Sequence, residues 1–162
     1  IVKNLCLISL FLIGTIFSQQ KQSASPWQAY TSLDLFDHRS GLAFYSVSLA
    51  KEIQDGREFF ASAGTMAFIN SIASGVRFNQ KRTSRYFDRT YFVTSARIMA
   101  FAHRDLAIEN LRFVPTLAIG FEKDISERSS VNVGIFSGLE YYGDERGVST
   151  FTMPTISYIT RW

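Results

Sequence analysis

The sequence predicts an all-β protein, an antiparallel up-and-down transmembrane β-barrel of about eight strands that follows a signal peptide. Three observations predict this fold. Segments of about ten residues with alternating polarity repeat from residue 29 to the end of the sequence. In several of these segments one face carries large apolar side chains, while the other carries small or charged ones. After residue 18, no stretch has an apolar stripe at helical spacing.

Residues 1–18 are typical of a secretory signal. Lys3 gives a positive start, residues 5–17 are mainly apolar, and Ser18 is a small residue of the kind that precedes a cleavage site. A transmembrane helix is the alternative interpretation. It would need roughly 20 apolar residues, whereas this run is shorter and is followed directly by the polar Gln19.

The only cysteine, Cys6, lies inside this signal. We therefore expect a mature chain without disulfide bonds or thiol chemistry. The length of 162 residues suits one folded domain. The predicted organisation is a signal peptide over 1–18, a polar lead-in over 19–28 and the barrel over 29–162.

Turn-forming residues divide the barrel region into the predicted strands. The strongest hairpin signal is Asp55-Gly56, a pair typical of two-residue turns. Strands are predicted over 29–36, 42–53, 58–68, 71–80, 89–101, 111–122, 129–142 and 148–162, with a tight reversal near Asn70. An even number of strands lets the sheet close. Closure matters because each unpaired backbone group in hydrocarbon costs several kcal/mol.

The distribution of large side chains predicts which face points outward. In residues 111–122 one face carries Leu111, Phe113, Leu117, Ile119 and Phe121, and the other carries Arg112, Thr116, Ala118, Gly120 and Glu122. An eight-stranded barrel has an interior only just wide enough for side chains to fill. The large apolar face would overfill it, so we expect that face to point outward into lipid. A soluble lipocalin-like barrel or β-sandwich is the alternative, with the apolar face as its core.

Charged residues on the small faces are then candidates for the lumen, where they can pair across the interior. These candidate lumen charges are Arg77, Arg97, Arg112, Glu122 and Glu140.

Two prolines count against the predicted barrel. Pro115 and Pro154 fall inside predicted strands, where each missing N–H breaks a ladder hydrogen bond unless a bulge absorbs it.

The last strand carries a second signal. Trp162 ends the sequence, with Tyr158 and Ile156 at alternate positions before it. This resembles the terminal strand of bacterial outer-membrane proteins, which the barrel-assembly machinery reads. Over residues 29–162 the chain resembles the small eight-stranded outer-membrane barrels of the OmpA/OmpX kind, in architecture and without a family-specific motif.

The resemblance implies a place in the outer membrane of a Gram-negative bacterium, as a monomer surrounded by the lipid bilayer and lipopolysaccharide. It also implies periplasmic turns near Asp55, Arg85 and Ser126, and external loops near Arg39, Asn70, Asp105 and Asp144. Aromatic residues gather in girdles at the two membrane interfaces of such barrels. The candidates are Tyr91, Phe121, Tyr141, Tyr158 and Trp162, although aromatic residues are also common in strands generally.

The sequence offers little for catalysis. His38-x-Ser40 invites comparison with the outer-membrane lipid A deacylases, but the pair lies in the first turn and no glutamate follows before Glu52. We therefore expect His38 to be a solvated loop residue. His103 lies far away in the sequence, and two separated histidines are a poor basis for a metal site. We expect no catalytic residue, cofactor or metal.

The net charge of +3 comes from scattered Lys and Arg residues, so no nucleic-acid surface is predicted. The expected function is that of a non-enzymatic outer-membrane barrel. Its role would be structural, adhesive or loop-mediated, with a lumen filled by side chains rather than conducting like a porin. The runner-up is a soluble exported barrel that binds an apolar ligand. A lipid-modifying enzyme of the outer membrane is the third possibility.

Overall fold

The computed structural model describes residues 26–34, 38–39, 43–66, 69–82, 84–101, 111–141 and 147–162. The predicted signal peptide, Ser40, His103 and the predicted loops near Asp105 and Asp144 lie outside the described residues. Within the described part of the chain, no helix is long and apolar enough to cross a membrane.

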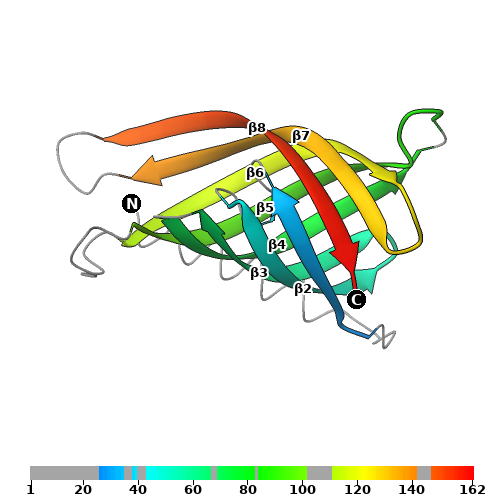
Figure 1. Cartoon of the computed structure of the whole chain (residues 1–162). Helices are drawn as coiled ribbons and strands as arrows, with labels where there is room; N and C mark the ends of the chain where they lie inside the picture. Colours follow the sequence, from blue (N-terminus) through cyan, green and yellow to red (C-terminus); the bar gives the residue numbers. More distant parts are fainter. Residues whose placement is uncertain are drawn as a thin grey trace.

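The described residues form a closed antiparallel barrel in which each strand pairs with its neighbours in sequence and β1 pairs with β8. The strands are β1 Gln28–Asp34, β2 Tyr45–Gln54, β3 Arg57–Met66, β4 Ile69–Lys81, β5 Arg89–Phe101, β6 Leu111–Asp124, β7 Ser129–Tyr141 and β8 Val148–Arg161. Figure 1 shows β8 crossing the front of the barrel beside β1. The predicted all-β, up-and-down barrel of eight strands is therefore confirmed.

Turn-forming residues set where the neighbouring strands end. Asp55 and Gly56 make a two-residue connection between β2 and β3, and Gly56 has the positive φ of 73° that glycine tolerates best. The tight reversal predicted near Asn70 is present but comes slightly earlier in the chain. Met66 pairs with Ile69, which closes the β3–β4 hairpin before Asn70 and places Asn70 inside β4.

The barrel has two unlike ends. One end holds the connections β2–β3, β4–β5 and β6–β7 together with the start of β1 and the end of β8. We call it the turn end. The opposite end, here the loop end, holds the connections β1–β2, β3–β4, β5–β6 and β7–β8.

Side chains divide between the two faces of the wall as the alternation predicts. Large apolar residues are exposed on the outside, among them Leu49, Ile72, Ile98, Leu117, Ile119, Ile135 and Ile156. Small, polar and charged residues are buried on the inside, among them Ser32, Ser48, Ser62, Arg77, Arg97, Thr116, Glu122 and Asn132. A few larger residues share the interior, chiefly Tyr30, Phe60, Tyr91 and Phe136. The apolar surface therefore faces away from the barrel axis.

The two strand prolines lie where one neighbouring ladder stops. Pairing between β6 and β7 ends at Thr116 with Gly138, so Pro115 is paired only with Ala96 on β5. The β5–β6 register runs through Pro115 without a bulge. A proline is tolerated where a strand has a partner on one side only, because one missing N–H then need not break a ladder bond.

Pro154 follows the same pattern. It pairs with Ile135 on β7, and the described pairing between β1 and β8 begins only at Ser157 with Asp34. On its other side Pro154 thus has no described ladder partner. Both prolines fit an uninterrupted register with their remaining neighbours.

Candidate functional site in the barrel interior

Small inward residues leave room inside the barrel wall. Buried or close-packed inward positions are occupied by Ser32, Ser46, Ser48, Ala50, Ser62, Ala73, Gly75, Ala118, Gly120 and Gly134. Eight strands normally enclose only enough space for the side chains of the wall itself. With side chains this small, the same ring of strands can hold a further piece of chain.

That piece of chain is contributed by the β1–β2 connection. His38 is 0% exposed and Arg39 is 2% exposed. The expectation that His38 is a solvated loop residue, and that an external loop lies near Arg39, was wrong. Both residues are inside the barrel, because the serine- and glycine-rich wall leaves space there and supplies polar partners.

His38 is held from several sides. Its ring lies against Tyr91, with 4.5 Å between the ring centroids. Arg77 Nη1 lies 3.5 Å from the imidazole Nε2, and Asn132 Nδ2 lies 3.5 Å from Nδ1. Arg97 donates to the His38 carbonyl at 3.5 Å. Residues from β4, β5 and β7 therefore surround one imidazole.

Arg39 continues from His38 toward the turn end. Its guanidinium donates to Glu58 Oε1 at 2.5 Å, and only 3% of the arginine and 15% of the glutamate side chain are exposed. The same guanidinium lies 4.4 Å from the centroid of the Tyr30 ring. The Ser62 hydroxyl donates to the Arg39 carbonyl at 3.0 Å. Charge, ring and backbone contacts together fix this residue.

Two of the candidate lumen charges meet in the deep interior. Arg77 and Glu122 form an ion pair between β4 and β6, with exposed fractions of 3% and 2%. Glu122 also accepts from Arg89 and Arg161, each at 2.8 Å. Arg97 lies elsewhere on the inner wall. One carboxylate is thus shared by three guanidinium groups.

Arg97 packs its guanidinium 4.6 Å from the centroid of the Phe136 ring and donates to Thr116 Oγ1 at 3.3 Å. The remaining two candidates, Arg112 and Glu140, form an ion pair on the inward side near the loop end, where the arginine side chain is 35% exposed. The structure therefore groups the five charges in three separate places.

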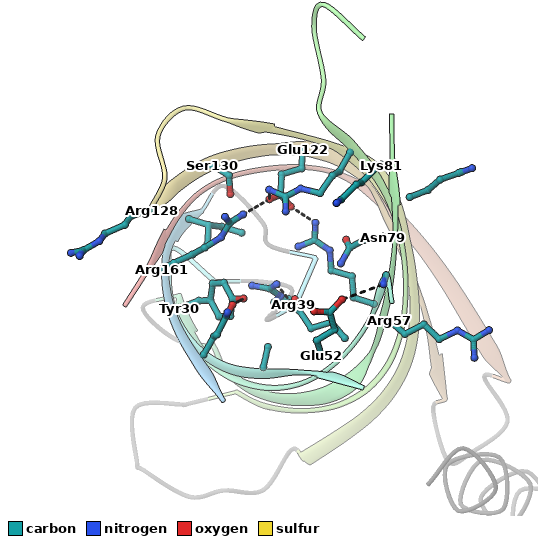
Figure 2. Close-up of a pocket in the computed structure, with 18 of the residues that line it drawn as sticks. Tyr30, Arg39, Glu52, Arg57, Asn79, Lys81, Glu122, Arg128, Ser130 and Arg161 are labelled. Atoms are coloured by element: carbon teal, nitrogen blue, oxygen red, sulfur yellow. Dashed lines mark hydrogen bonds and ion pairs between the residues drawn. The ribbon is translucent and has the colours of Figure 1, made fainter. Parts of the chain in front are cut away.

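A cavity of about 1060 Å³ opens at the turn end. Figure 2 shows Arg39 near the centre of the ring of strands, with Tyr30 and Glu52 on one side and Glu122 and Arg161 on the other. Arg57 and Arg128 point away from the ring. The cavity is thus a vestibule whose floor includes Arg39 and whose wall is made of ion pairs.

On the outer surface, aromatic rings gather at the turn end. Phe87 stacks on Phe121 at 4.8 Å between centroids, Phe78 lies 6.1 Å from Phe92, and Trp27 lies 6.2 Å from Phe59.

Tyr158 is 42% exposed and Trp162 is 76% exposed, with the indole donating to Thr31 Oγ1 at 3.0 Å. Ile156, at 46% exposed, shares this outer face of β8.

The assignment of Tyr91 to a girdle was wrong. Tyr91 is 2% exposed and points into the barrel, since inward and outward residues alternate and Phe92 is the outward one. The side chain of Tyr141 lies outside the part of the chain that the structure describes.

Sequence reasoning missed several residues of this site. Glu58, Arg89 and Arg161 stand at inward positions of β3, β5 and β8, and counting by twos from a buried neighbour would have found them. His38 and Arg39 carry no such signal, because they lie in a connection without alternation. Among the described residues, no group of three or more His, Cys, Asp or Glu side chains could hold a metal ion.

No protein-family model matches the chain, and no relative is found among the curated proteins.

Proposed function

We propose that the protein is a barrel of the Gram-negative outer membrane with a structural, adhesive or loop-mediated interaction role and a filled lumen. One observation carries the proposal. The large apolar side chains are on the outside of the barrel, and the ionic and hydroxyl groups are on the inside. Lipid is the solvent that favours such an arrangement, because it accepts apolar side chains and not polar ones.

The exposed apolar side chains on the outer surface favour a lipid environment over water. Leaving a Leu, Ile or Phe side chain in water forgoes about 1.5–3 kcal/mol that burial would supply. Leu117, Ile119, Ile135 and Ile72 are each more than half exposed. Monomeric soluble proteins rarely expose continuous apolar patches beyond a few hundred Å². A bilayer would surround the barrel and cover the exposed apolar side chains of all its strands.

The interior argues against the soluble alternative. A lipocalin-like protein needs an apolar cavity for its ligand, and pockets of that kind are lined mainly by hydrophobic side chains. Here the vestibule is lined by Arg39, Glu58, Arg77, Glu122 and Arg161. An apolar ligand would have to displace water from these charged groups without replacing their hydrogen bonds.

The turn end has the features expected at a membrane interface. Its outward aromatic rings lie next to exposed cations, and Arg57 lies 5.7 Å from the centroid of the Phe78 ring. Aromatic rings and long cationic side chains are enriched where hydrocarbon meets headgroups. Because β1 begins and β8 ends at the turn end, we assign this end to the periplasmic side, with the loop end toward lipopolysaccharide.

A lipid-modifying enzyme receives no support from the described residues. A catalytic histidine must reach a substrate, whereas His38 is 0% exposed and packs against Tyr91 in the middle of the barrel. The proposed role therefore does not use His38 as a base.

Membrane fractionation combined with gel mobility tests the proposal. We expect the protein in the outer-membrane fraction, with a faster-migrating band in unheated samples that shifts on boiling, as a closed barrel resists detergent. As an independent measurement, the purified chain should fold spontaneously in the presence of lipid vesicles and float with them. Recovery in the soluble fraction with no mobility shift would overturn the proposal.

A further inference from the structure

We infer that one sector of the turn end binds the headgroups of anionic phospholipids. The sector carries outward cations on β2 and β3 and exposed cations in the β4–β5 turn. We call it the headgroup strip: Lys51, Arg57, Arg82 and Arg85. The inference rests on the proposed function, because the strip meets headgroups only if the barrel is in a bilayer. It deepens that function by naming the class of lipid that the turn end binds and the side chains that bind it.

Lys51 lies on the outer wall beside aromatic rings. It is two residues beyond Leu49, which is exposed on the same face of β2. It pairs with Phe59 on β3, and the Trp27 ring lies edge-on to Phe59 with 6.2 Å between the centroids. A lysine stem in such surroundings covers apolar surface while its ammonium group reaches toward the headgroup layer.

Arg57 repeats this arrangement closer to the β2–β3 turn. Its guanidinium lies 5.7 Å from the centroid of the Phe78 ring, and Phe78 lies 6.1 Å from Phe92 on β5. Figure 2 shows Arg57 pointing away from the ring of strands. The guanidinium is therefore on the outer side of the wall, among the rings that mark an interface with headgroups. A guanidinium binds a phosphate group strongly, because two of its N–H groups can donate in parallel.

The β4–β5 turn adds two exposed arginines to the strip. Phe87 stacks on the outward Phe121, so the turn is held against the outer wall. The turn is also closed by its own backbone, where the N–H of Arg82 donates to the Asp88 carbonyl at 2.9 Å. The exposed side chains of Arg82 and Arg85 therefore extend from a fixed turn at the edge of the outer apolar surface.

The positive charge of the strip is not neutralised locally. Within the described part of the chain, none of its four cations forms an ion pair. Glu52 and Glu58, although next to the strip in sequence, line the vestibule inside the barrel. In the two adjoining turns Asp88 is paired with Lys123 at 3.1 Å, which leaves Asp55 as the one unpaired carboxylate.

This balance of charge decides the kind of partner. Four cations against one carboxylate leave an excess of three positive charges. The excess lies beside exposed apolar and aromatic side chains, so the surface fits a partner that is anionic at one end and apolar at the other. An anionic phospholipid has this chemistry, and cationic side chains at a membrane surface attract such lipids.

Quenching of Trp27 by brominated lipids tests the inference. The chain has two tryptophans, so Trp162→Phe leaves Trp27 as the reporter beside the strip. This protein is folded into phosphatidylcholine vesicles that contain either brominated phosphatidylglycerol or brominated phosphatidylcholine. Phosphatidylglycerol should be preferred near Trp27 by about fivefold, the contribution expected from one cation at the surface. High salt should reduce the preference, because it screens exposed charges.

Paired variants in the same background assign the preference to the strip. Lys51→Gln/Arg57→Gln should bring the preference close to one, whereas Arg57→Lys keeps the charge and should retain it. The matched control is Arg128→Gln, which removes an exposed arginine from the β6–β7 turn on the opposite side of the barrel (Figure 2) and should also retain it. Heat-modifiable mobility checks that each variant is folded.

The arginines of the β4–β5 turn need a second measurement, because the Trp27 reporter is on β3. Phosphatidylglycerol in the vesicles should raise the urea concentration that unfolds the wild-type barrel. The rise should shrink in Arg82→Gln/Arg85→Gln and stay unchanged in Arg128→Gln. An equal rise in both variants would remove the turn from the strip.

The outcomes separate this inference from the proposed function. Equal quenching by the two brominated lipids in the folded, inserted protein would overturn the headgroup strip and leave the membrane barrel standing. A preference that survives in Lys51→Gln/Arg57→Gln, or that falls as far in Arg128→Gln, would overturn the strip as well. Failure of the wild type to enter vesicles of either composition would overturn the proposed function, and the strip with it.

Discussion

Arg77 on β4 and Glu122 on β6 form an ion pair inside the barrel, with 3% and 2% of their side chains exposed. Two further guanidinium groups, of Arg89 and Arg161, share the same carboxylate. A buried ion pair of this kind adds little net stability over an apolar pair, but removing one partner leaves an uncompensated charge. Glu122 is therefore the residue on which the interior charge balance depends.

Glu122→Gln should destabilise the barrel strongly. It leaves three guanidinium groups facing an amide, and the loss should be about 3–5 kcal/mol. Urea unfolding of the barrel in vesicles measures it. Glu140→Gln is the control, because its partner Arg112 is 35% exposed and should lose only about 1 kcal/mol or less. Equal losses in the two variants would contradict the central role of Glu122.

A charge in the middle of the outer wall should separate a lipid-facing surface from a wet one. Leu117 is 54% exposed near the centre of β6. Leu117→Arg should cost about 2–4 kcal/mol of stability in a bilayer. Val148→Arg, at the start of β8, should cost at most about 1 kcal/mol. If Leu117→Arg unfolds at the same urea concentration as wild type, the lipid-facing assignment is wrong.

Gly120 is required where the Tyr91 side chain lies against the inner wall of β6. A Cβ placed on Gly120 would lie 2.5 Å from the Tyr91 hydroxyl oxygen and 2.5 Å from the Val133 carbonyl oxygen. Gly120→Ala should therefore destabilise the barrel by about 1–3 kcal/mol, as overpacking does. Thermal unfolding in detergent measures the effect, with the outward substitution Ala61→Val as control. A neutral Gly120→Ala would mean that Tyr91 can move aside at no cost.

Asp88, in the β4–β5 turn, should make stability depend on pH. The backbone N–H of Asp124 and the ammonium of Lys123, at 2.9 Å and 3.1 Å, hold the pKa of the Asp88 carboxyl below its usual 3.8. A carboxyl whose folded pKa is depressed contributes stability above its unfolded pKa, and that contribution is lost as pH falls through the folded value.

Asp88→Asn should accordingly be less stable than wild type at neutral pH, and the difference should shrink below pH 4 and vanish at lower pH. Paired urea titrations across that range check the sign. Lys123→Met should reduce the pH-dependent part of the difference. A gap between Asp88→Asn and wild type that stays constant down to pH 2 would contradict the expectation.

The sequence by itself determined the barrel. Alternation in residues 111–122 and 129–142, the Asp55-Gly56 turn and the spacing of the connections were enough to predict eight antiparallel strands and the orientation of their faces, because both depend on local backbone geometry with a period of two. The same period placed Arg77, Arg97 and Glu122 on the inner face. Tyr91 was misassigned because tyrosines are common at membrane interfaces. Its position in the alternation, next to the outward Phe92, places its side chain inside the barrel.

Only the tertiary structure decided what fills the barrel. Nothing periodic marks His38 and Arg39, and their burial depends on serines and glycines contributed by several strands far apart in sequence. Which arginine pairs with which carboxylate depended in the same way on strand register, which brings Arg77 and Glu122 together across 45 residues. Local preference fixes a strand and its faces, whereas the occupant of a lumen is set by the space and charge that remain after all eight strands have closed.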